Sequence, residues 1–140
     1  MASGAGLLDT NIFIHAYAQD AATEDCRRFL LALEAGKVRA VMSPLILHEL
    51  SYAFPRYIKQ MTHQDIANYL LMVLGWEAVQ GEKGAMVDAV ERWRDTSGLA
   101  FADAYLAALA AEQDRPVYSK NLRELRAQGV EVPDPLPTVA

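Results

Sequence analysis

Short apolar runs alternate along the chain with longer segments in which apolar residues recur every three or four positions. The short runs predict buried strands and the periodic segments predict amphipathic helices. The expected strands are residues 6–9, 38–42, 76–80, 116–119 and 130–133. The expected helices are residues 12–33 with a break near Asp20, 44–54, 62–74, 82–94, 99–113 and 122–127. This alternation predicts an α/β fold with a mostly parallel central sheet covered by helices on both faces.

Local signals mark several of the helix boundaries. Ser43 followed by Pro44 is typical of an N-cap residue and a proline in the first helical position. Thr62 with Asp65 three residues later indicates the start of another helix, and Gly75 indicates its end. These boundaries follow from short-range chemistry, so they do not depend on how the helices pack.

Length and composition favour one globular domain. The chain has 140 residues, of which 52% are hydrophobic, enough for a single core. We expect the domain to span residues 1–133, followed by a loose tail at residues 134–140. The lone Cys26 cannot form an internal disulfide, and the opening residues MASGAG lack the features of a secretory signal, which predicts a cytoplasmic protein. No apolar run approaches the roughly 20 residues that span a bilayer, so we expect no membrane partner.

Three acidic residues stand in apolar surroundings. Asp9 follows an apolar pair in LLDTNIFIHAY, while Glu49 and Asp103 have mostly apolar neighbours at helical spacing. Burying a carboxylate is costly unless its charge is compensated. Since ligands of parallel sheets bind beyond the carboxyl ends of the strands, we expect the three acids to converge at that edge. Two such charges about 4 Å apart repel by roughly 4 kcal/mol at an effective dielectric of about 20, so convergence requires a cation or proton uptake.

The expected cation is Mg²⁺ or Mn²⁺, because the donors are oxygens with no histidine or cysteine cluster nearby. The net charge of -5 argues against indiscriminate nucleic-acid binding, but bound cations would reverse the local sign that a phosphate meets. Simpler explanations exist for each acid. Asp9 would serve as a turn or cap residue, Glu49 as a partly exposed helical residue, and Asp103 as a cap or the partner of an arginine.

Four segments resemble a known family in their order and spacing: LLDTNIFIHAY, SPLILHEL, GLAFADAYLAALA and PVYSKNLREL. Together they resemble the PIN-domain ribonucleases, and among them the VapC toxins of bacterial toxin–antitoxin pairs. The resemblance implies that Asp9, Glu49 and Asp103 are the catalytic, metal-binding acids. It implies supporting roles for the polar side chains of Thr10, Asn11 and Ser119.

The fourth acidic position of the family is occupied here by Asn121. An amide oxygen can still bind a metal directly or through water, and Glu124 one helical turn later is a candidate replacement. The number of metal ions, one or two, therefore stays open at this point.

The resemblance also implies a fold, a substrate and partners. The fold would be a PIN-like three-layer α/β/α sandwich, and the protein would be a homodimer. The substrate would be RNA (tRNA, rRNA or mRNA), and a VapB-like antitoxin would insert a segment into the active-site groove.

Candidate RNA-binding residues flank the expected site. The basic ones are Lys120, Arg123, Arg126, Arg56 and Lys59. Three aromatic residues are candidates for stacking on bases or for receiving an apolar antitoxin segment: Tyr52, Phe54 and Tyr57. The alternative is that these charges form a solvated face and the aromatic side chains belong to the core.

Two other functions remain open. A receiver domain that accepts a phosphoryl group also places an acid after its first strand. It would need a second acid beside Asp9 and an acceptor aspartate at the end of a central strand, and neither is evident in the sequence. A binding module with the PIN fold and little or no catalysis is favoured by Asn121.

Overall fold

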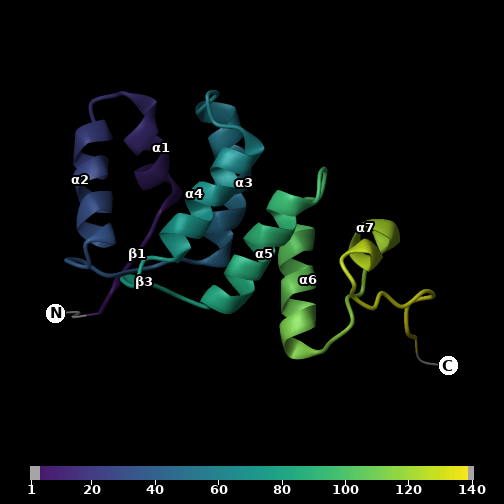
Figure 1. Cartoon of the computed structure of the whole chain (residues 1–140). Coiled ribbons are helices and arrows are strands. Elements are labelled where there is room, and N and C mark those ends of the chain that lie inside the picture. Colours follow the sequence, from purple (N-terminus) through teal and green to yellow (C-terminus); the bar gives the residue numbers. More distant parts are fainter. Residues whose placement is uncertain (1–3, 139–140) are drawn as a thin grey trace. The chain divides into compact units, whose positions relative to one another are not determined.

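The computed structural model describes residues 4–138, in which it contains three strands and seven helices (Figure 1). The first three residues of the expected domain and the last two of the expected tail lie outside this range. The chain divides into two compact units, Met1–Lys83 and Gly84–Ala140.

The first unit contains the whole sheet. Its elements are β1 (Gly6–Leu7), α1 (Thr10–Ala18), α2 (Thr23–Glu34), β2 (Ala40–Val41), α3 (Pro44–Tyr57), α4 (His63–Leu74) and β3 (Val79–Gln80). The strand order is β1-β2-β3, and both pairs are parallel. The register places Ala40 between Gly6 and Val79. The prediction of an α/β fold with a parallel sheet is confirmed, and the elements are consistent with a three-layer α/β/α sandwich.

Side-chain caps form the helix starts that the sequence predicted. The Ser43 hydroxyl accepts a hydrogen bond of 3.4 Å from the backbone N–H of Ile46 at the start of α3. At α4 the Thr62 hydroxyl accepts from the N–H of Asp65 at 3.1 Å, while the Asp65 carboxylate accepts from the N–H of Thr62 at 2.9 Å. This capping box also lowers the pKa of Asp65, because the N–H of Thr62 stabilises the carboxylate.

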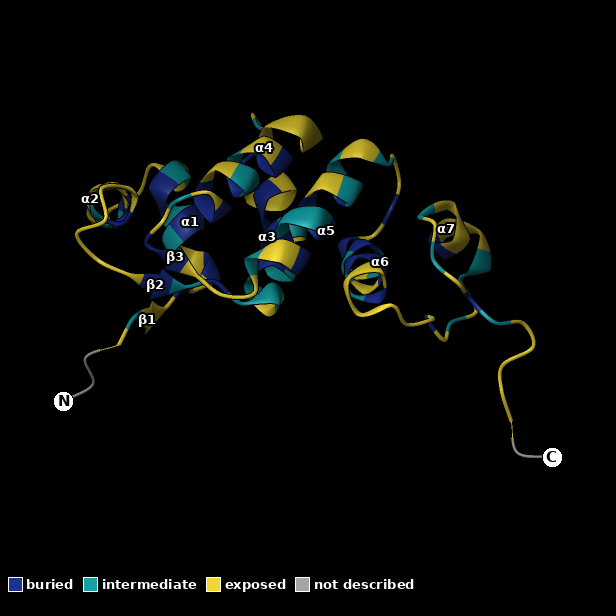
Figure 2. Cartoon of the chain, turned by 60° about the horizontal axis from the view of Figure 1, so that its bottom comes forward, coloured by how far each residue is buried: buried dark blue, intermediate teal, exposed yellow. Residues whose placement is uncertain are grey.

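An aromatic cluster joins three helices of the first unit. Phe13 and Tyr17 come from α1, Phe54 from α3 and Tyr69 from α4. The Tyr69 ring meets the other three edge to face, with centroids 5.4–6.4 Å apart. Phe13 and Phe54 are fully buried, and Figure 2 shows the buried sides of these helices in dark blue. The cluster therefore positions α1, which directly follows Asp9, against α3, which carries Glu49.

The second unit is helical and has a core cluster of its own. Its elements are α5 (Lys83–Asp95), of which all but the first residue belong to this unit, α6 (Phe101–Gln113) and α7 (Leu122–Ala127). A cluster of buried side chains joins the end of α6 and α7 to the segments that flank α7: Ala110, Val117, Leu125 and Val132. Arg92 donates to the carbonyl of Gln128 at 2.7 Å and so ties α5 to the end of α7.

The two strands predicted near the carboxyl end were wrong. Residues 116–119 and 130–133 contain no strand, although the N–H of Val117 donates to the carbonyl of Glu131 at 2.9 Å. Pro116 and Pro133 begin and end these segments without an N–H to donate, which limits a ladder. One valine in each segment, Val117 and Val132, is nevertheless buried in a core cluster. The other expected strands are present, but each has only two paired residues.

Among residues 4–138, no helix is long and apolar enough to cross a membrane. Residues 134–138 of the expected tail are in neither a helix nor a strand.

Candidate functional site

Asp9 occupies the N-cap position of α1, two residues after the end of β1. Its backbone is extended, with φ -111° and ψ 152°, as an N-cap requires, but its side chain makes no capping hydrogen bond. The expectation that Asp9 is buried was wrong, because the residue is exposed. The N–H of Leu8 still donates to the carbonyl of Val41 in the next strand at 3.0 Å, so Asp9 is the first residue beyond this pairing. An exposed carboxylate that does not cap its own helix is open to an external ligand.

Thr10 and Glu49 form a direct contact between α1 and α3. Thr10 is the first residue of α1 and only 8% exposed. Its hydroxyl donates a 2.7 Å hydrogen bond to Oε2 of Glu49, which is half-buried on α3 and 39 positions later in the chain. A carboxylate can only accept, so the hydroxyl proton must point at Glu49. Thr10 therefore fixes the orientation of one oxygen of this carboxylate.

Thr10→Val tests this contact, because valine keeps the shape of threonine and removes the donor. We expect the free energy of unfolding to fall by about 1 kcal/mol, since Glu49 loses a hydrogen bond at a partly buried position. Thr10→Ser retains the hydroxyl and serves as the matched control, with a smaller loss. Equilibrium denaturation in urea measures both. Equal losses in the two variants would show that the hydroxyl contributes nothing.

Asp103, Ser119 and Asn121 lie together in the second unit. Asp103 is half-buried in the first turn of α6. The amide Nδ2 of Asn121 donates to Oδ2 of Asp103 at 2.6 Å, and the backbone N–H of Asn121 donates to the Ser119 hydroxyl at 2.9 Å. Asn121 precedes α7 but does not cap it with its side chain. Three of the residues singled out in the sequence are thus joined by hydrogen bonds.

The other polar candidates lie on the surface of their helices. Asn11 is the second residue of α1, and Glu124 lies in the first turn of α7; both are exposed. The supporting role of Asn11 and the replacement of the fourth acid by Glu124 stay predictions.

Three of the basic candidates already have partners within the chain. Lys120 lies 3.7 Å from the carboxylate of Asp134, an exposed pair that contributes little stability. Arg126 donates to the carbonyl of Val132 at 2.8 Å. The Arg56 guanidinium lies 5.5 Å from the centre of the Tyr57 ring. Two further candidates are exposed: Arg123 and Lys59.

The aromatic candidates divide by exposure. Tyr52 and Tyr57 are exposed, as base stacking requires. The suggestion that Phe54 receives a base or a partner segment was wrong, because its side chain is fully buried in the aromatic cluster. Tyr118 was missed: it is 66% exposed directly before Ser119. The sequence placed it in an expected buried strand, so its exposure was not foreseen.

The structure supplies oxygen donors, the chemistry that suits Mg²⁺ or Mn²⁺. Asp9 and Glu49 belong to the first unit and Asp103 to the second. Among residues 4–138, no group of three or more histidine, cysteine, aspartate or glutamate side chains lies close enough together to hold a metal ion. The donor chemistry fits the expected cation, and the convergence of all three acids stays a prediction.

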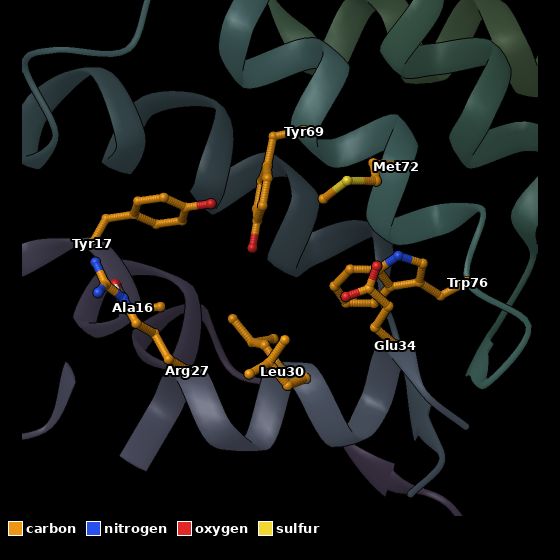
Figure 3. Close-up of a pocket in the computed structure, with 9 residues that line it drawn as sticks. Ala16, Tyr17, Arg27, Leu30, Glu34, Tyr69, Met72 and Trp76 are labelled. Atoms are coloured by element: carbon orange, nitrogen blue, oxygen red, sulfur yellow. Dashed lines mark hydrogen bonds between the residues drawn. The ribbon is translucent and has the colours of Figure 1, made fainter. Parts of the chain in front are cut away.

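A separate apolar cavity of about 310 Å³ lies in the first unit (Figure 3). Its lining comes from α1, α2, α4 and the turn after α4: Ala16, Tyr17, Arg27, Leu30, Leu31, Glu34, Tyr69, Met72 and Trp76. Burial is the main cause that raises the pKa of Tyr69, so its hydroxyl stays neutral there. The sequence analysis missed this cavity, although Arg27, Leu31 and Glu34 share one face of α2 at helical spacing. Its lining includes none of the candidate acids.

Comparison with known proteins gives one positive result. Neither a curated protein nor a solved structure matches the chain. The PIN domain family matches residues 6–127, a span that covers most of the chain and contains every candidate site residue named above. On this match, the chain belongs to the PIN-domain family.

Proposed function

We propose that this PIN domain is a Mg²⁺- or Mn²⁺-dependent endoribonuclease that acts as the toxin of a VapBC-type toxin–antitoxin pair. The observation that carries the proposal is the family match, because it includes Asp9, Glu49 and Asp103 in one domain type. PIN domains are typically metal-dependent nucleases. The match gives no support to the receiver-like alternative.

The acids have distinct roles in the proposal. Asp9 and Asp103 would be the principal metal ligands, and Glu49 would bind metal or orient the attacking water. When bound, the cation supplies charge relief to the phosphate and lowers the pKa of bound water. The exposed carboxylate of Asp9 and the hydrogen-bonded carboxylates of Glu49 and Asp103 support these roles.

Around the acids, neutral polar groups would orient ligands. Thr10 holds one oxygen of Glu49, and Ser119 accepts the N–H of Asn121. Both contacts limit the freedom of groups near a charged ligand, which is what supporting residues do in metal sites. Asn11 would contact the phosphate from its exposed position on α1.

RNA would be held by exposed basic and aromatic side chains rather than by overall charge, since the net charge is -5. Arg123 and Lys59 are exposed, and Tyr52, Tyr57 and Tyr118 offer exposed rings on which bases can stack. The RNA could be tRNA, rRNA or mRNA, because stacking and phosphate contacts do not select among them.

The proposed protein partners are a VapB-like antitoxin and a second copy of this chain. Exposed apolar side chains support a partner surface in the first unit: Leu31 is 63% exposed and Met72 47% exposed at the cavity of Figure 3. Because this surface contains none of the candidate acids, it would suit the second copy of the chain, whereas the antitoxin segment would insert at the acids.

A second candidate function is a PIN-fold binding module with weak or no catalysis. The observation that favours it is the neutral Asn121 bound to Asp103, since the family expects an acid at that position.

Cleavage of single-stranded RNA by the purified chain distinguishes the two functions. We expect cleavage with Mg²⁺ or Mn²⁺, loss of cleavage when EDTA is in excess, and recovery when the cation is restored. Asp103→Asn removes a proposed ligand in the second unit and should lose the activity. Cleavage by the chain itself that persists in EDTA would contradict the proposal, while RNA binding without cleavage would support the binding module.

A further inference from the structure

Asn121 uses its side chain in an unusual way for a residue that precedes a helix. Asparagine in this position commonly caps the helix, but here the side chain leaves α7 uncapped and binds Asp103 instead. The carboxylate can only accept, so the amide nitrogen must face Oδ2 of Asp103. The two atoms lie 2.6 Å apart.

The position of Asn121 is fixed by a second contact. Its backbone N–H donates to the hydroxyl of Ser119 at 2.9 Å, within the short segment that joins Val117 to α7. Leu125 on α7 and Val117 are both buried in the core cluster of the second unit. Buried residues therefore anchor both ends of this segment, Val117 before Asn121 and Leu125 after it, which keeps the amide of Asn121 next to Asp103.

A carboxylate in place of this amide would have the opposite effect. Two carboxylates at hydrogen-bond distance repel, so an acid at position 121 would require either a cation or a shared proton between them. The amide instead gives Asp103 a neutral donor that occupies Oδ2. A cation that uses Oδ2 as well must first displace that donor, whereas Oδ1 of Asp103 accepts no hydrogen bond recorded in the described part of the chain.

We propose that Asn121 is a positioning residue that takes the place of a second metal ion: it holds Oδ2 of Asp103 and leaves the other oxygen for a single cation. This inference rests on the proposed function, since it concerns the cation that Asp103 would bind there. The protein then binds one divalent ion per chain, and the second unit keeps Asp103 oriented without any ion.

The test is the stoichiometry of Mn²⁺ binding to the full chain, measured from the free-ion signal in electron paramagnetic resonance. We expect one ion per chain for the parent and two for Asn121→Asp, which has the same shape and an added charge. Thermal unfolding in EDTA gives a second measurement. Asn121→Asp should unfold about 3–6 °C below the parent, and Mn²⁺ should restore most of the difference.

Asn68→Asp is the matched control, because it adds the same charge at an exposed asparagine on α4. It should leave the stoichiometry at one. If Asn121→Asp does not fold in EDTA, refolding it in Mn²⁺ and counting bound ions gives the same test.

Two ions in the parent, none in the parent, or one in Asn121→Asp would each overturn the inference. The proposed function is judged separately by RNA cleavage. A parent that cleaves RNA with two bound ions would refute only the inference. A change from one ion to two without RNA cleavage in either protein would refute only the ribonuclease proposal.

Discussion

Asp9→Asn is expected to lower the rate of metal-dependent RNA cleavage by about 100-fold or more, while the fold remains intact. The substitution removes a charged ligand, and changes even to groups behind a ligand typically cost about 10–100-fold. Stability should change little, because Asp9 is exposed and its carboxylate does not cap α1. Asparagine is also as good an N-cap residue as aspartate. Initial cleavage rates at saturating Mg²⁺, with circular dichroism for the fold, measure both effects.

Asp25→Asn provides the matched control in the same unit. Asp25 is an exposed aspartate on α2 whose nearest charged partner, Arg28, lies 3.8 Å away. The chemical change is identical, so its cleavage rate should equal that of the parent. If Asp9→Asn cleaved as fast as Asp25→Asn, the metal-ligand role of Asp9 would be refuted.

Phe54→Ala should reduce the free energy of unfolding by about 3–5 kcal/mol, the range for large aromatic residues removed from cores. Phe54 is fully buried and meets the rings of Tyr17 and Tyr69 edge to face, with centroids 6.1 and 5.7 Å away. Its removal leaves a cavity where α1, α3 and α4 pack together. Urea denaturation followed by tryptophan fluorescence measures the change.

Tyr57→Ala, on the same helix and 60% exposed, separates packing from helix propensity. A surface substitution of this kind should stay within about 0.5 kcal/mol of the parent. Similar losses in the two variants would mean that the aromatic cluster does not stabilise the first unit.

Local chemistry made many boundaries predictable. The capping box of Thr62 and Asp65 and the Ser43-Pro44 start lie where the sequence placed them. The break between α1 and α2 and the short helix α7 were also predicted correctly. Each of these signals acts over about four residues, so it can be recognised without knowledge of the tertiary fold.

Strand pairing and exposure were less predictable. An apolar run at residues 116–119 resembles a buried strand, but strand formation needs a partner elsewhere in the chain. Here the partner segment supplies one backbone hydrogen bond and a shared apolar cluster. The same dependence on context explains why Asp9 is exposed, contrary to expectation, and why the sequence left both a binding role and a core position open for the buried Phe54.

The sequence by itself determined the α/β class, most helix starts and the list of acids, because these depend on residue type and short-range spacing. Only the tertiary structure decided which polar groups meet. Thr10 and Glu49 are 39 positions apart, and Asp103 and Asn121 are 18 apart, yet each pair shares a hydrogen bond. Such contacts depend on how helices pack, and packing is set by the sum of many weak apolar contacts that no local pattern encodes.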